Sequence, residues 1–158
     1  MSANALVPAS VTSDAAKLFV GFQVNGVSYA LPADAVVQME TYTGATPVPG
    51  TQRFVAGIVQ LRGRIIPVID LRARFDLPPI ERTLDTRVIV GELAGRHVAV
   101  VADSAREVLR IAPSQEKAPP RLVELGARGF IRSVAQLGDR TVMILDFAKL
   151  IGEEPIDV

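Results

Sequence analysis

The stretch LRGRIIPVIDL, residues 61–71, decides the fold class of this chain. Its unbroken apolar run, 65–69, indicates a strand that is buried on both faces. Arg62 and Gly63 precede this strand and follow a shorter apolar run, IVQL, so we expect a hairpin with Arg62-Gly63 as its turn. Pro67 is tolerable where the strand ladder does not need its missing N–H. The stretch therefore predicts a tight β-hairpin whose turn carries an exposed arginine.

Three further hairpins are predicted by the same pattern of short apolar runs around a turn that contains glycine. Their turns are Asn25-Gly26, Ala94-Gly95 and Gly138-Asp139. Glycine and proline together number 23, which is typical of an all-β chain with many turns. Short helical turns are expected only at 32–38 and 104–109 and after each of Asp70 and Asp146.

An internal duplication relates the hairpins to one another. Residues 54–75 align with 130–151 at a constant offset of 76, and 25–34 align with 94–103 at an offset of 69. A repeat of about 70 residues gives each copy about five short strands. A small closed barrel per copy leaves no exposed edge and fits this strand number, although periodicity alone does not distinguish a barrel from a sandwich.

The boundaries of the domain follow from composition. We interpret residues 1–16 as a flexible leader, 17–152 as the folded domain with its copies at about 18–75 and 87–151, and 153–158 as an acidic tail. The leader has no basic region followed by a long apolar run, so it does not resemble a signal peptide. No apolar segment approaches the roughly 18 residues of a membrane helix, so no direct membrane insertion is predicted.

Composition argues against several function classes. Lys+Arg and Asp+Glu number 17 each and aromatic residues make up 5%, so neither the basic excess nor the stacking platforms of a nucleic-acid binder are present. Without cysteine and with His97 as the only histidine, a thiol nucleophile or a histidine-rich metal site cannot be assembled. We read Asp70 and Asp146 as helix N-caps rather than an acid–base pair. No catalytic residue, metal or cofactor is predicted.

Five arginines cluster around the first-copy hairpin. Arg64, Arg72 and Arg74 are read as solvated side chains of a turn and a short helix. Arg62 differs because the second copy has Gly138-Asp139 in place of Arg62-Gly63. A hairpin needs the turn glycine but not the arginine, so this guanidinium is interpreted as a group that faces a partner.

The blocks FVAGIVQLRGRIIPVIDLRARF, VADSAREVL and GFIRSVAQLGDRTVMILDFAKLI resemble the CheW family of bacterial chemotaxis coupling proteins. The resemblance extends over about residues 17–152. It implies an all-β fold of two intertwined five-stranded SH3-like β-barrels with a few short helices. It also implies a non-catalytic adaptor that couples a CheA-type histidine kinase to the cytoplasmic tip of methyl-accepting chemoreceptors, in the cytoplasm at receptor arrays near the inner face of the membrane.

The resemblance also implies a receptor-facing surface in the groove between the barrels and on the Leu-Arg-Gly turn. The matching positions are Val36, Gly57, Arg62, Ala99, Ala105 and Val108. The kinase-facing surface is expected to be apolar and on the first barrel, without assignment to residues.

This chain departs from the family pattern at three places. Gln60 replaces the usual Asn before Leu-Arg-Gly, and Ala105 is smaller than the usual apolar residue. Gln38 stands where an acidic residue is common, which leaves Glu40 as the carboxylate that could partner Arg62.

Two alternatives within the same fold stay open at this point. The chain could be a CheW-like coupling protein of a non-flagellar chemosensory pathway, such as one for twitching motility or second-messenger control. The regulatory domain of the kinase itself also resembles this family, but the absence of kinase motifs disfavours it.

Overall fold

The computed structural model describes residues 15–126 and 129–152, so most of the predicted leader and the predicted acidic tail lie outside the described residues. Strands dominate, with only short helical segments between them, which confirms the predicted all-β class. The elements are β1(Lys17–Val24), β2(Val27–Pro32), η2(Ala33–Ala35), β3(Val36–Thr41), β4(Val55–Leu61), β5(Arg64–Asp70), α2(Leu71–Arg74), β6(Arg87–Leu93), β7(Arg96–Ala102), β8(Ser104–Ile111), η3(Pro113–Gln115), β9(Glu116–Lys117), α3(Arg121–Gly126), β10(Ile131–Leu137), β11(Arg140–Leu145) and α4(Phe147–Ile151).

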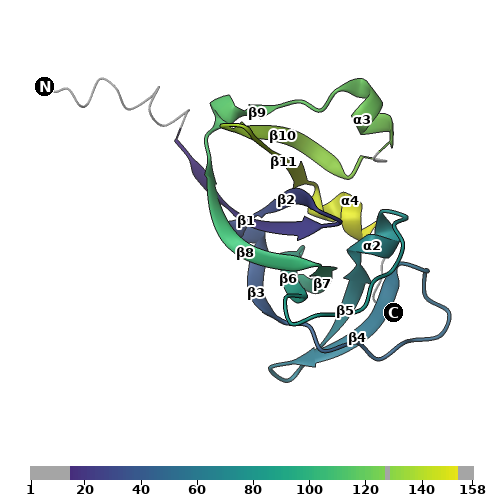
Figure 1. Ribbon diagram of the computed structural model, residues 1–158. Helices are drawn as coiled ribbons and strands as arrows, with labels where there is room; N and C mark the ends of the chain where they lie inside the picture. Colours follow the sequence, from purple (N-terminus) through teal and green to yellow (C-terminus); the bar gives the residue numbers. More distant parts are fainter. Residues whose placement is uncertain (1–14, 127–128, 153–158) are drawn as a thin grey trace, which may run out of the picture.

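The strands form two sheets, and each sheet combines strands from both halves of the chain. One sheet has the order β8-β1-β2-β11-β10-β9 and the other has the order β3-β6-β7-β5-β4. Figure 1 shows the first as the upper barrel and the second as the lower one. A barrel built from one copy alone is therefore not what the chain forms. The two copies exchange strands, as the family resemblance implies, while the copy boundaries predicted above stay a prediction.

The exchange is reciprocal and follows the sequence duplication. The parallel pair Ile144↔Ala30 joins β11 to β2, and the equivalent pair Val68↔Ala99 joins β5 to β7 at the offsets of 76 and 69. The antiparallel pair β3–β6 is likewise the duplicate of the pair β8–β1, and each has a bulge at the equivalent position. The duplication thus gives the protein an approximate internal two-fold symmetry.

The turn predictions are confirmed. Each hairpin forms at its predicted dipeptide, and Arg62 and Gly63 have φ angles of 51° and 79°, the positive values of a type I′ turn. Pro67 is tolerated because the pairing of β5 with β7 begins at Val68, so the missing N–H interrupts no bond with that strand.

Three apolar clusters explain why β5 needs apolar residues on both faces. Ile66 and Val68 point into the lower barrel, whereas Ile69 belongs to a large cluster packed between the two barrels. A separate cluster around Phe19 fills the upper barrel. The prediction of a strand buried on both faces holds from Ile66 onward, but Ile65, at the start of the strand, is 69% exposed.

Asp70 and Asp146 are the predicted helix N-caps. Asp70 Oδ1 accepts a hydrogen bond from the backbone N–H of Arg72 at 2.9 Å, and Asp146 Oδ1 accepts one from that of Lys149 at 3.1 Å. Each carboxylate satisfies a backbone donor that the first turn of its helix leaves free.

The predicted helical turns at 32–38 and 104–109 are corrected by the structure. The first is reduced to the single 3₁₀ turn Ala33–Ala35, and Val36 already begins a strand. The second is wholly strand β8, which pairs with β1 along its length. Pairing with the other copy overrides local propensity in both segments.

Arg74 is not the solvated side chain that the sequence suggested. Its guanidinium lies 3.9 Å from the ring centroid of Phe54 and 4.8 Å from that of the duplicate residue Phe130. Its Nε and Nη2 donate to the backbone carbonyls of Leu150 and Lys149 at 2.7 and 3.1 Å. Arg74 therefore joins the two copies close to the internal two-fold axis.

Candidate functional site

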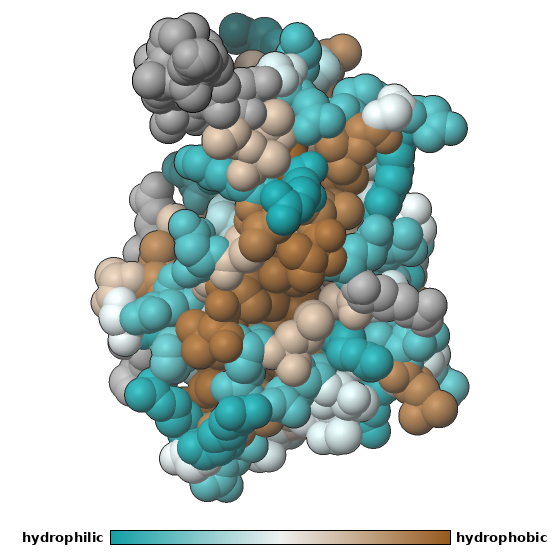
Figure 2. All heavy atoms as spheres, turned by 90° about the vertical axis from the view of Figure 1, so that its left-hand side faces the viewer, coloured by the Kyte–Doolittle hydropathy of each residue, from teal (hydrophilic) through white to brown (hydrophobic). Residues whose placement is uncertain are grey.

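An apolar strip runs along the contact between the two barrels, where the edge strands β3 and β8 meet the interbarrel cluster. Figure 2 faces this side of the molecule and shows a continuous band of apolar residues bordered by polar ones. We define the interbarrel strip by its residues on β1, β3 and β8, namely Val20, Val36, Met39, Ala105 and Val108.

Register explains why these residues share one surface. Val108 pairs with Val20 on β1, whose other partner, Leu31, is buried in the interbarrel cluster. Met39, the duplicate of Val108, pairs with Ile89, which is buried in the same cluster. Val108 is 66% and Met39 41% exposed, so the strip offers two apolar walls to a partner. Isolated exposed apolar residues need no explanation, but a contiguous band typically marks a binding surface.

Three of the predicted receptor-facing residues lie on this strip. Val36 and Ala105 are duplicates of each other and both pack against the interbarrel cluster, Val36 half-buried and Ala105 buried. Val108 lies three residues after Ala105 on β8 and is exposed. The fold therefore brings these three residues together on one surface.

Gly57 and Ala99 lie elsewhere. Ala99 is completely buried within the lower barrel, and Gly57 is buried at the bulge of β4. A Cβ added to Gly57 would lie 2.0 Å from the backbone carbonyl oxygen of Thr46, so glycine is required there for a close backbone approach. Neither residue presents a side chain to the strip.

Arg62 lies in the turn between β4 and β5 and reaches Glu40 on β3. Its side chain is 76% exposed, and its Nη2 lies 3.6 Å from Oε2 of Glu40. Gln38 Nε2 donates to the same oxygen at 2.9 Å. Gln38 and Glu40 are two residues apart on β3 and face the same side, so Glu40 supplies the carboxylate that position 38 lacks. Arg62 keeps most of its donors available.

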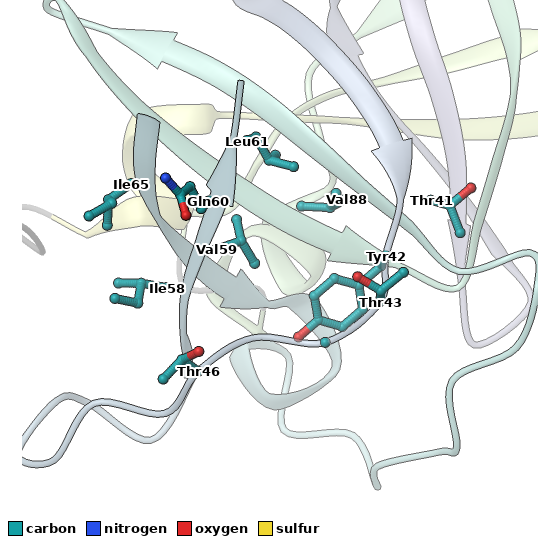
Figure 3. Close-up of a pocket in the computed structure, with 11 residues that line it drawn as sticks. Thr41, Tyr42, Thr43, Thr46, Ile58, Val59, Gln60, Leu61, Ile65 and Val88 are labelled. Carbon is teal, nitrogen blue, oxygen red and sulfur yellow. The ribbon is translucent and has the colours of Figure 1, made fainter. Parts of the chain in front are cut away.

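A second surface lies at the open side of the lower barrel. β3 and β4 are the two edges of the five-stranded sheet, and an isolated bridge pairs Thr46 with Ile58 outside the strands. A pocket of about 300 Å³ occupies this opening. Figure 3 shows the side chains that line it, with Val59, Leu61 and Val88 on one side of β4 and Ile58 and Ile65 on the other. We call this pocket together with the exposed residue Ile65 the barrel seam.

Arg72 corrects the prediction of a solvated side chain. Only 12% of it is exposed, and it forms an ion pair with Asp103, with Nε and Nη2 donating to the carboxylate at 3.0 and 2.9 Å. Burial acts to raise the pKa of Asp103, but the hydrogen bonds from Arg72 and from the backbone N–H of Asn25, with the guanidinium charge, outweigh it and hold the pKa below its usual value. Asp103 is thus an ionised residue that links the two copies, and it does not cap a helix.

Arg140 and Glu107 form a comparable pair at the upper barrel, with Nη1 of Arg140 donating to Oε1 of Glu107 at 3.0 Å and a second bond between the same side chains. The hydrogen bond from Arg140 lowers the pKa of Glu107. The duplicate of Glu107 in the lower barrel is Gln38, so the two barrels differ in charge at equivalent places.

In the described part of the chain, no helix is long and apolar enough to cross a membrane.

Sequence reasoning missed Met39 and Ile65 as surface residues, whereas Glu40 was expected as a partner of Arg62 and does pair with it. The duplication held a signal for Met39, because it is the counterpart of Val108 at the offset of 69. Nothing in the sequence signalled that Ile65, at the head of an apolar run, would be exposed.

These features define a class of protein: an all-β domain of two strand-exchanged barrels that presents separate apolar surfaces. Comparison with known proteins identifies the family. The model of the CheW-like domain matches residues 18–154. The chemotaxis protein CheW of Bacillus subtilis is 32% identical over 84% of this chain and 85% of its own length. That of Klebsiella aerogenes is 29% identical over 86% and 82%, respectively.

A solved structure agrees with this fold. The crystal structure of the scaffolding protein TtCheW from Thermoanaerobacter tengcongensis superposes with a TM-score of 0.80 at 30% identity, covering 87% of this chain and 93% of the other. The chain belongs to the CheW family of chemotaxis adaptors, which confirms the resemblance inferred from its sequence.

Proposed function

We propose that this protein couples a CheA-type histidine kinase to the cytoplasmic tip of methyl-accepting chemoreceptors, in the cytoplasm at receptor arrays, and has no catalytic activity of its own. The observation that carries the proposal is the presence of two apolar surfaces on different parts of the molecule, the interbarrel strip and the barrel seam. An adaptor needs two such surfaces because it must hold two partners at once.

The interbarrel strip suits a receptor helix. Its walls carry small and medium apolar side chains, Val36, Ala105 and Val108, over which a helix can approach closely. Arg62, exposed on the β4–β5 turn of the lower barrel, can donate to a carboxylate or to the C-terminal carbonyls of that helix. Gly57 and Ala99 act in this proposal by shaping the lower barrel that carries Arg62.

The barrel seam is the surface we assign to the kinase. It lies on the lower barrel, is lined by both threonine and apolar side chains, and includes Ile65, which is 69% exposed. Two interfaces on so small a body must each be modest, near the roughly 800 Å² per partner of standard complexes. Simultaneous binding within an array would then supply the strength that each contact lacks.

The test is a co-sedimentation experiment with a CheA-type kinase and a receptor cytoplasmic fragment. We expect the kinase to sediment with the receptor only when this protein is present. Val108→Asp should weaken receptor binding about 10-fold or more, and Ile65→Asp should do the same for the kinase, because each places a charge in an apolar contact. Leu84→Asp is the control, since Leu84 is 89% exposed and lies outside both surfaces. Sedimentation of the kinase that does not depend on this protein would disprove the coupling role.

Arg62→Ala is expected to weaken receptor binding while changing the free energy of unfolding by less than about 0.5 kcal/mol, because the side chain is exposed and its ion pair is weak. Arg53→Ala is the matched control. It removes a similarly exposed arginine of the same barrel from its ion pair with Asp76 and should leave binding unchanged. Binding affinities and thermal unfolding of both variants check the prediction; a marked loss of melting temperature with intact receptor binding would contradict it.

A further inference from the structure

The chain crosses between the two barrels at two equivalent points. It passes from the upper to the lower barrel at Ala33–Ala35, between β2 and β3, and returns at Asp103, between β7 and β8. Each crossing leads directly into one wall of the interbarrel strip, since Val36 follows the first and Ala105 the second. The spacing of the two walls therefore depends on how firmly each crossing is held.

The crossing at Asp103 is held firmly. Arg72, at the start of α2, donates to the Asp103 carboxylate through Nε and Nη2 and to the carbonyl of Pro78 through Nη1 at 2.8 Å. The backbone N–H groups of Asn25 and Asp103 add bonds at 2.8 and 3.0 Å, the second to the carbonyl of Gln23. These contacts join α2, the β1–β2 hairpin and the root of β8.

The crossing at Ala33–Ala35 lacks the matching ion pair. Asp34 is the duplicate of Asp103 at the offset of 69, and the duplicate of Arg72 at the offset of 76 is Ala148. The parallel pairs Val68↔Ala99 and Ile144↔Ala30 are equivalent, and the chain leads on from the first to Arg72 and Asp103 and from the second to the equivalent positions Ala148 and Asp34. Asp34 and Ala148 are both exposed, and among the described residues Asp34 makes no ion pair.

We infer that Arg72 and Asp103 are positioning residues that hold the β8 wall of the interbarrel strip against the lower barrel, while the β3 wall is tied less firmly at Asp34. This inference gives the strip one fixed and one adjustable wall. It rests on the proposed function only in so far as the strip binds the receptor; the difference between the two crossings is a property of the protein alone.

The geometry can be measured in the full chain. The sequence contains no cysteine, so cysteines introduced at Thr41 on β3 and Arg110 on β8, both exposed, carry spin labels specifically. Distances between the labels should be narrowly distributed in the parent protein. Arg72→Ala should broaden the distribution, Arg72→Lys should broaden it less, and the exchanged pair Arg72→Asp with Asp103→Arg should narrow it again in part, because the exchange keeps the ion pair but loses the bonds to Asn25 and Pro78.

Ala148→Arg tests the inference in the opposite direction. Because it removes no buried ion pair, it should not unfold the protein. It introduces the missing guanidinium beside Asp34 and should narrow the distribution. An unchanged width in both Arg72→Ala and Ala148→Arg would overturn the inference.

Binding separates a positioning role from general destabilisation. Arg72→Ala should weaken receptor-fragment binding about 5- to 10-fold, within the usual range for residues that modulate a site without touching the ligand, and should change kinase binding less than about twofold. Equal weakening of both partners would indicate partial unfolding and would overturn the positioning role. If the labels respond as expected but the parent protein binds no receptor fragment, the positioning pair stands and the proposed function fails.

Discussion

Arg74→Ala is expected to lower the free energy of unfolding by about 2–4 kcal/mol. The change removes two hydrogen bonds from a charged donor to backbone carbonyls and the contacts of one guanidinium with two rings, Phe54 and Phe130. The carbonyls of Leu150 and Lys149 lie at the end of α4, where a cation is favourable. Because Arg74 joins the first copy to the last helix of the second, its loss should loosen the contact between the copies as well as lower stability.

Urea unfolding of the full chain measures this effect. Arg87→Ala is the matched control, because Arg87 also donates to two backbone carbonyls, those of Leu84 and Thr86, but within its own local segment. We expect that variant to lose less than about 1 kcal/mol. Similar losses in the two variants would mean that Arg74 is not special as a link between the copies.

Gly57→Ala should destabilise the protein by about 3 kcal/mol or more. Gly57 has a φ of 141°, and an added Cβ would meet the carbonyl of Thr46, a backbone group that cannot simply rotate away. Thr46 and Ile58 exchange two backbone hydrogen bonds of 2.9 Å, so displacing Thr46 also opens the barrel seam.

Gly63→Ala is the appropriate comparison for this prediction. Gly63 also has a positive φ, of 79°, but nothing lies within 4 Å of the added Cβ, so only the backbone strain of roughly 1–2 kcal/mol is expected. Thermal unfolding distinguishes the two. Receptor binding measured per folded molecule should be unchanged in Gly57→Ala, and a specific loss of receptor binding with full stability would instead support a direct contact at this position.

Much of the fold could be predicted because its signals are local. Turn dipeptides such as Arg62-Gly63 require positive φ angles that few residue pairs tolerate, and a strand such as β5 needs apolar residues on both faces if both are covered. The duplication was visible because equivalent positions in the two copies meet equivalent surroundings. N-caps such as Asp70 depend on backbone donors only one or two residues away.

The predictions that failed involve residues whose partners lie in the other copy. Arg72 and Arg74 have the pattern of an exposed helix face. Yet Arg72 donates a hydrogen bond to Asp103, 31 residues away, and Arg74 donates one to the carbonyl of Leu150, 76 residues away. Residues 104–109 have a helix-compatible pattern but form strand β8, because β1 offers a free edge to pair with. The receptor-facing residues stay a prediction: Val36, Ala105 and Val108 gather on one strip, whereas Gly57 and Ala99 are buried in the lower barrel.

Most strands, the turns, the duplication and the family resemblance could be predicted from the sequence, because each depends on residues that are neighbours in the chain or on a pattern repeated along it. Only the tertiary structure decided which copy supplies the neighbour of each strand, and thereby which arginines are buried and which apolar residues face outward. The choice depends on contacts between distant residues, such as Val68 with Ala99, that no local pattern encodes.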